Sequence, residues 1–339
     1  MAAAVKANGY GHGLVRVARV LDADAFAVAS IEEALILREA GITQPILLLE
    51  GIFAATELPL CARHGFEIAV HHPEQARMLE QARLERPVRV WLKLDTGMHR
   101  LGVEPDTAPA LFQQLRACPA VQPDPGFMSH LARADERDCD YTLEQLRRFE
   151  SATAGLPGQR SLANSAGILG WPDTHFDQVR PGIMLYGASP FVDSLAPEEN
   201  LRPVMTFHTQ LISIKRLRQG EPVGYGGTWV CPEDIDVGVA AVGYGDGYPR
   251  HAPSGTPVLI NGREAALIGR VSMDMITVDL RSHPDARIGD PVVLWGEGLP
   301  VERIAQAAGA ISYTLLCGVT ARVTVETLDP SPSPLQDQP

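Results

Sequence analysis

Lys6 is the first residue in the sequence whose type and position suit chemistry. It ends the apolar run Ala2–Lys6, and the glycine-rich turn Asn8–Gly13 follows almost at once. A lysine amine that is removed from water has a lowered pKa, and its neutral form is a nucleophile that can form a Schiff base. A strand-end lysine that only reaches solvent is the alternative. The glycines favour the chemical interpretation, because they let backbone or ligand approach closely.

A second set of polar residues surrounds the end of the apolar run Arg89–Leu94. Lys93, Asp95 and Arg100 lie within eight residues there, and a guanidinium at this place could bind a carboxylate through two hydrogen bonds. An ion pair between Asp95 and Arg100 is the structural alternative. His130 ends another apolar run and, taken singly, is more simply a structural histidine.

Residues suited to a phosphate group follow two later apolar runs. Ser165 and the backbone N–H groups of Gly182 and Ile183 could bind a phosphate, in the two loops that commonly form the phosphate site of barrel enzymes. A lysine amine, a phosphate cradle and an arginine on one rim of a barrel together suggest a pyridoxal-phosphate site.

The elements that must position these residues alternate between short apolar runs and amphipathic stretches. Strands are expected at Ala2–Lys6, Ala25–Ala29, Ile46–Leu49, Glu67–Val70, Arg89–Leu94, Gly126–Ser129, Arg160–Ala163 and Gln178–Arg180. Helices are expected at Leu14–Leu21, Ile31–Ala40, Ala54–Arg63, Glu74–Leu84, Thr107–Ala117 and Tyr141–Ala154. This α/β alternation predicts a parallel sheet, and eight strands would close a (β/α)8 TIM-like barrel. An open doubly wound sheet is the alternative.

After about Met205 the pattern becomes mainly β. Strands are expected at Phe207–Ile214, Val237–Val242, Pro257–Ile260, Ala265–Val271, Ile276–Leu280, Pro291–Leu294 and Arg322–Thr327, with one helix at Val301–Ala308. We therefore expect a barrel domain over residues 1–204, a β-rich C-terminal domain over 205–328, and a disordered tail over 329–339.

Length and composition agree with a two-domain globular enzyme. The chain has 339 residues, of which 45% are hydrophobic and 21% charged, and its formal net charge is −12. Such an acidic surface argues against binding nucleic acid or an anionic membrane. No apolar run is long enough to span a bilayer, and the first residues do not resemble a signal peptide. The five cysteines are scattered without metal-ligand spacing, so a reduced, cytoplasmic protein is expected, with no metal.

The segment Val5–Gly13 resembles the cofactor-lysine motif of the alanine racemases, and the resemblance covers most of the chain. It implies that Lys6 holds pyridoxal phosphate as an internal aldimine and that Arg180 faces the pyridine nitrogen. A permanent cation there disfavours protonation of that nitrogen and should suppress side reactions. The resemblance implies that the phosphate is contacted by Tyr10, Ser165, Gly182 and Ile183.

The same resemblance implies a substrate site. Arg100 and the backbone N–H of Met273 would bind the alanine carboxylate. Lys93 matches a lysine that is often carbamylated in the family, and its added carboxylate would hold Arg100. His130 and Asn164 occupy matching positions behind the residues that touch the ligands.

Tyr244, taken alone, would most often be a packing tyrosine, but the matching residue of the family is a catalytic base from the partner subunit of a homodimer. Racemisation removes the Cα proton from one face and returns a proton to the other, which two bases on opposite faces do directly. Lys6 would act on D-alanine and Tyr244 on L-alanine. The product would supply peptidoglycan synthesis, or the enzyme would catabolise D-alanine.

Three features depart from the family pattern. Members usually carry a longer segment before the lysine motif, which supplies an early helix and a strand. Many have a tyrosine at the phosphate where Ala321 is aligned, and some have a histidine where Ser161 is aligned. Two other functions share this type of barrel. A non-catalytic pyridoxal-phosphate carrier would lack the Met205–Leu328 region, and Arg100 with Ser272–Asp274 favours a racemase over a decarboxylase.

Overall fold

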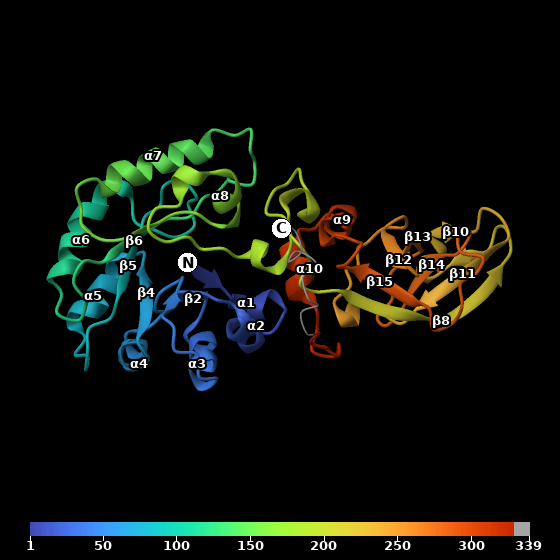
Figure 1. Ribbon diagram of the computed structural model, residues 1–339, viewed down its shortest axis with the longest axis horizontal. Helices are drawn as coiled ribbons and strands as arrows, with labels where there is room; N and C mark the ends of the chain where they lie inside the picture. The colour runs from blue at the N-terminus through green and yellow to red at the C-terminus, as the bar shows by residue number, and fades with distance from the viewer. Residues whose placement is uncertain (329–339) are drawn as a thin grey trace, which may run out of the picture.

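The computed structural model describes residues 1–328, and the expected tail at 329–339 lies outside the described residues. Figure 1 shows two parts side by side, an α/β part formed by the first half of the chain and a β-rich part formed by the second. The last two helices, α9 (Val301–Ala307) and α10 (Ser312–Gly318), lie where the two parts meet.

The first part is a parallel sheet of seven strands that pair in chain order. The strands are β1 (Ala2–Ala4), β2 (Ala25–Val28), β3 (Ile46–Leu48), β4 (Phe66–Val70), β5 (Val90–Lys93), β6 (Gly126–Met128) and β7 (Arg160–Ser161). The helices are α1 (Lys6–Tyr10), α2 (Leu14–Val20), α3 (Ile31–Glu39), α4 (Leu58–His64), α5 (Pro73–Gln81), α6 (Ala108–Ala117), α7 (Tyr141–Thr153) and α8 (Ser165–Gly170). Each of the six expected helices occurs with its bounds shifted by a few residues, whereas α1 and α8 were not expected.

Local sequence accounts for the helix ends. The Ser30 hydroxyl caps α3 by accepting a hydrogen bond from the Glu33 N–H. Gly65 ends α4 with a φ of 64°, a left-handed conformation that glycine adopts without steric cost. The helices lie along the outside of the sheet, where their apolar faces bury one face of the strands (Figure 1).

The other face of the sheet packs on itself. Its buried residues are mostly small, and they are Ala2, Ala25, Ala27, Leu47, Ala69, Trp91 and Met128. Trp91 fills the space between them, since a Cβ atom at Gly126 would lie only 2.5 Å from the indole ring. Small side chains around one large ring let the strands curl towards one another, as in a barrel interior.

The strand expected at Gln178–Arg180 does not occur as such. The segment nevertheless lies beside β1, because the amides of Ala2 and Ala4 donate to the carbonyls of Val179 and Pro181, both at 2.9 Å. On its other side the Arg180 N–H donates to the Ala163 carbonyl at 2.9 Å. Pro181 has no N–H to donate, so regular pairing cannot continue past Arg180.

The second part is a closed antiparallel barrel in the order β11-β14-β13-β12-β15-β8. Its strands are β8 (Phe207–Leu217), β11 (Ile235–Ala240), β12 (Pro257–Ile260), β13 (Arg263–Ile268), β14 (Ile276–Asp279) and β15 (Pro291–Trp295), and a separate pair is formed by β9 (Pro222–Val223) and β10 (Trp229–Val230). The mainly β prediction for this region is confirmed. The strand expected at Arg322–Thr327 is wrong, because this segment is largely exposed and pairs with no neighbouring strand in residues 1–328.

The last two helices connect the two parts. Glu302 on α9 accepts a hydrogen bond from the Ser189 N–H at 2.6 Å. On α10 the Leu316 carbonyl oxygen lies 2.0 Å from where a Cβ atom at Gly11 would stand, so only glycine allows α10 to approach α1 this closely. Within residues 1–328, no helix has the length and apolar character needed to cross a membrane.

Candidate active site

Lys6 begins a tight turn at the carboxyl end of β1. The strand ends at Ala4, two residues earlier than expected, and Lys6 opens α1. Inside this turn Ala7, Asn8 and Gly9 all have left-handed backbone angles, with φ values of 52°, 55° and 61°. Such angles are costly for an alanine, so the surroundings must hold the turn in place.

Glu33 on α3 supplies that support. Its carboxylate accepts hydrogen bonds from the Ala7 N–H at 2.7 Å and the Ala29 N–H at 3.0 Å. The Asn8 side chain accepts a further bond from the Leu14 N–H at 3.0 Å. The turn is therefore tied to both neighbouring helices, and the direction in which Lys6 leaves the backbone is set by them.

Four cations act on the charge of His130. The pKa of this histidine lies well below its ordinary value, because its ring is buried and Arg180, Arg100, Lys93 and Lys6 all disfavour a further positive charge. The residues come from separate strands and loops, but the carboxyl ends of parallel strands all lie at the same end of the sheet. The structure therefore brings together five of the site residues that the sequence predicted.

Lys93 is the most buried of these lysines. Only 6% of it is exposed, and its amine lies 3.5 Å from the Leu49 carbonyl oxygen. Burial, together with the cations Arg180 and Arg100, lowers the pKa of Lys93 to about 8. A substantial part of this amine is therefore neutral just above neutral pH.

Arg180 is buried and held on several sides. Its guanidinium donates to the Ser161 hydroxyl, to the Ser129 carbonyl and, at 3.3 Å, to the Leu162 carbonyl. Burial lowers the pKa of Arg180 to about 10, so the group keeps its charge at neutral pH. Ser161 thus supports this arginine directly.

Tyr10, Ser165 and Gly182 form a small polar cradle beside the turn. The Tyr10 hydroxyl lies 2.7 Å from where a Cβ atom at Gly182 would stand, and burial raises the pKa of Tyr10 to about 12, so it stays a donor. The Ser165 hydroxyl accepts from the Gly182 N–H at 2.8 Å. Asn164 caps α8 by accepting from the Gly167 N–H at 2.9 Å, which orients Ser165. The next residue, Ile183, is fully buried.

Tyr313 is a neighbour of this cradle that the sequence analysis missed. It lies on α10 with its ring centre 6.0 Å from that of Tyr10. Ala321, by contrast, is exposed and follows the end of α10. A second tyrosine is therefore present beside Tyr10, eight residues before Ala321 in the sequence. The missed helix α10 was the reason, since its short length leaves little periodicity to detect.

Arg100 does not form the ion pair that was considered for it. Asp95 instead accepts from the Gly97 and His99 N–H groups at 3.0 Å, and it contacts the His99 ring at 3.1 Å. The carboxylate thus shapes the loop after β5, and the Arg100 side chain is exposed. A guanidinium without this partner is available to bind a ligand carboxylate.

Tyr244 and Met273 lie together on the second part of the chain. The Tyr244 N–H donates to the Ser272 carbonyl at 3.1 Å, and the Gly245 N–H donates to the Met273 carbonyl at 2.8 Å. Tyr244 is 39% exposed and Met273 is 53% exposed. Tyr244 is therefore not a core tyrosine, and both side chains face the outside of the chain.

Comparisons with known proteins agree along both parts. A family model described as alanine racemase, N-terminal domain, matches residues 1–190, and one described as alanine racemase, C-terminal domain, matches residues 204–327. The biosynthetic alanine racemase of Escherichia coli (strain K12) is 55% identical over 331 residues, which are 97% of this chain and 92% of that protein.

Solved structures resemble the chain equally well. The crystal structure of the biosynthetic alanine racemase from Pseudomonas aeruginosa matches with a TM-score of 0.92 and 48% identity, covering 95% of this chain and 90% of that one. The alanine racemase from Acinetobacter baumannii matches with a TM-score of 0.86 and 37% identity over the same shares.

The fold, the lysine-centred cationic site and these matches define an enzyme of the isomerase class, a racemase. Both parts of the chain match models of one family, in the order in which that family carries them. The chain belongs to the alanine racemase family.

Proposed function

We propose that this protein interconverts L-alanine and D-alanine as a homodimer, with pyridoxal phosphate as its cofactor. The observation that carries the proposal is that Lys6, Lys93, Arg100 and Arg180 come from the carboxyl ends of parallel strands or the loops after them, and all four lower the pKa of His130. The chain has a net charge of −12, yet four cations lie at one end of its parallel sheet. Such a group of cations is suited to ligands that carry a phosphate and a carboxylate.

The cradle beside the lysine turn fits the cofactor phosphate. Tyr10 and Ser165 would donate hydroxyl groups, and Gly182 and Ile183 would donate backbone N–H groups, the Gly182 N–H in exchange for its bond to the Ser165 hydroxyl. Gly182 has no side chain to fill the space in front of the Tyr10 hydroxyl. Lys6, at the end of β1, would attach the cofactor through its amine.

When bound, pyridoxal phosphate supplies an electron sink that makes the Cα proton of an attached amino acid acidic. Arg180 would face the ring nitrogen of the cofactor, and the three acceptors that hold its guanidinium keep it in place. A cation that retains its charge disfavours a proton on that nitrogen. Arg180 would thereby limit charge delocalisation and suppress side reactions.

Arg100 would bind the alanine carboxylate, together with the backbone N–H of Met273. Carbamylation of Lys93 would help to hold Arg100. The neutral Lys93 amine attacks carbon dioxide, an N–C bond forms, and one proton leaves to solvent. The lowered pKa of Lys93 supplies that neutral amine, and the charges of Arg180 and Arg100, which disfavour a cation at Lys93, would favour the anionic product.

Two bases would move the Cα proton. Lys6 Nζ would take it from D-alanine, and the Tyr244 phenolate oxygen of a second subunit would take it from L-alanine. Support for the second subunit comes from exposure. Besides Tyr244 and Met273, the side chains of Tyr225 and Met275 on the same part of the chain are also exposed, which leaves apolar surface for a partner to cover.

Two structural expectations belong to this proposal. The segment 178–181 would act as the eighth strand, since it bonds to both edges of the seven-stranded sheet, and the barrel and β domains would divide at about residue 204. The reaction would take place in the cytoplasm. It would supply D-alanine for peptidoglycan, in line with the relatives named biosynthetic alanine racemases, and catabolism of D-alanine is the alternative role.

The test exploits the scarcity of lysine, since the chain has only Lys6, Lys93 and Lys215. Borohydride reduction of the holoenzyme should attach the cofactor to the peptide that contains Lys6. Lys6→Ala should lack the visible absorption of the bound cofactor, and a solution of L-alanine should keep its optical rotation in its presence. Neither wild type nor Lys6→Ala should release carbon dioxide. Lys215 is exposed, so Lys215→Ala is the matched control. It should keep both the visible absorption of the cofactor and the racemisation of L-alanine. Normal labelling of the Lys6→Ala variant would exclude the assignment.

A further inference from the structure

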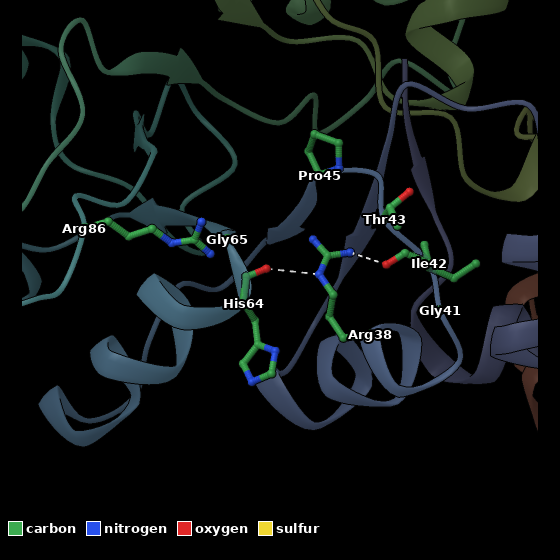
Figure 2. A pocket seen from close by; sticks show the side chains of 8 residues that line it. All are labelled: Arg38, Gly41, Ile42, Thr43, Pro45, His64, Gly65 and Arg86. Carbon is green, nitrogen blue, oxygen red and sulfur yellow. Dashed lines mark hydrogen bonds between the residues drawn. The ribbon is translucent and has the colours of Figure 1, made fainter.

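A cavity of about 430 Å³ lies at the end of the sheet opposite to Lys6. Pro45 stands directly before β3 and Gly65 directly before β4, so the cavity lies at the amino ends of these two strands. Figure 2 shows the guanidinium groups of Arg38 and Arg86 entering it from two sides, while the His64 ring points away.

Backbone carbonyl groups hold both arginines. Arg38 on α3 donates to the carbonyls of His64 at 3.0 Å, Ile42 at 2.6 Å and Gln44 at 2.8 Å. The position of the Arg38 guanidinium is therefore set by the chain at the ends of α3 and α4. These carbonyls also explain why the arginines are present, because a guanidinium can cap the last turn of a helix.

Arg86 is held in the same way, from the loop before β5. It donates to the carbonyls of Ala62 and Arg63 at the end of α4. In residues 1–328, Arg38 Nη2 and Arg86 Nη1 have no hydrogen-bond partner. Each arginine therefore has donors to spare for a ligand.

The two positive charges are not neutralised within the chain. Neither Arg38 nor Arg86 forms an ion pair with any carboxylate in the described part of the chain, including their sequence neighbours Glu39 and Glu85. The two cations line the same cavity, and burial together with the charge of Arg86 lowers the pKa of Arg38. Two adjacent cations repel each other, and a bound dianion would remove this cost.

We propose that the cavity between Arg38 and Arg86 binds a phosphate group, either free phosphate or a small phosphate monoester. A phosphate dianion balances both arginines and accepts hydrogen bonds from two directions, whereas a single carboxylate balances one. The cavity volume is in the range of small-molecule sites. Ile42 and Pro45 line the remaining wall and would contact the organic part of an ester.

The site is distinct from the cradle at Ser165, because the two lie at opposite ends of the sheet. Titrations should therefore use the holoenzyme, whose cradle is filled, with inorganic phosphate in one series and glycerol phosphate in the other. We expect saturable heat with one site per chain, at constant ionic strength. Tighter binding of glycerol phosphate would identify an ester as the ligand, and equal binding would identify free phosphate.

Two variants and one control test the location. Arg86→Gln should raise the dissociation constant roughly tenfold or more, since it removes charge-assisted hydrogen bonds. Thr43→Glu adds a carboxylate at an exposed position on the rim and should abolish binding without removing a helix cap. Arg83→Gln makes the same change in net charge on an exposed arginine of the same loop and should leave the constant unchanged.

If wild type shows no saturable binding of either ligand, or if Arg83→Gln weakens binding as much as Arg86→Gln does, the cavity is not the site. All variants should racemise alanine at the wild-type rate, which shows that they fold. Should Arg86→Gln fail to fold, Thr43→Glu decides alone.

Discussion

Arg180 donates a hydrogen bond to the hydroxyl of Ser161, and that hydroxyl donates in turn to the carbonyl of Gln178 at 2.6 Å. The two residues belong to different segments of the chain. Ser161 is the last residue of β7, and Arg180 lies on the segment beside β1. Their contact therefore fixes a buried cation at the place where the two edges of the sheet approach each other.

Ser161→Ala should destabilise the protein, because it leaves one Arg180 donor without a partner in a buried place. An unsatisfied buried donor costs about 1–3 kcal/mol. Urea unfolding of the apoprotein would measure this loss. Ser151→Ala, at an exposed serine on α7, is the control and should change the free energy of unfolding by less than about 0.5 kcal/mol. An unchanged free energy in Ser161→Ala would mean that the Ser129 and Leu162 carbonyls suffice to hold Arg180.

Glu33→Ala should loosen the lysine turn. The carboxylate holds the Ala7 N–H within a turn whose left-handed angles need support. We expect cofactor affinity to fall about tenfold, since hydrogen bonds to a charged group contribute about 1.5–3 kcal/mol. Equilibrium titration with pyridoxal phosphate would measure it. Glu32→Ala changes an exposed glutamate in the same turn of α3 and should bind the cofactor as wild type does; a similar loss in both variants would contradict the role of Glu33.

Lys93 should make stability depend on pH in alkaline solution. Its pKa is about 8 in the folded chain against 10.5 in the unfolded one, so the unfolded state binds more protons between these values. The free energy of unfolding should therefore rise as the pH is raised from about 8 to about 10.5, by up to about 3 kcal/mol. Urea unfolding of the apoprotein in carbon-dioxide-free buffer would follow it.

Lys93→Met is the matching variant, because it keeps the chain length and removes the charge. It should be more stable than wild type at pH 7, and the difference should fade towards pH 10. A variant that is less stable than wild type at both pH values would contradict the lowered pKa. Bicarbonate should stabilise wild type and leave the variant unchanged if Lys93 becomes carbamylated.

Mixed dimers should recover activity from two inactive parents. Lys6→Ala removes one base and the cofactor anchor, and Tyr244→Phe removes the other base. If Tyr244 acts across the interface, a mixed dimer has one site with both lesions and one with neither. Random co-assembly makes half of the dimers mixed, so activity should return to roughly a quarter of wild type. Co-expressed chains, shown to be mixed by two affinity tags, provide the measurement. Mixed dimers as inactive as their parents would place Tyr244 outside the partner's site.

The local features of this protein could be predicted from its sequence. Helices such as α3 and α7 follow from apolar residues spaced by one turn, and the change to β structure after about Met205 follows from short apolar runs between glycines and prolines. Lys6 was identified because a lysine beside a glycine-rich turn is unusual in itself. These features depend on residues close in sequence, whose mutual geometry is set by the backbone.

The approach of distant residues was decided by the tertiary structure. Asp95 binds its own loop rather than Arg100, Tyr313 reaches Tyr10 from the far end of the chain, and the segment at 178–181 joins β1 without forming a regular strand. Each depends on how strands pair and helices pack, and sequence spacing does not encode this. The same holds for Arg38 and Arg86, which are 48 positions apart in the sequence and meet only because both donate to carbonyl groups at the end of α4.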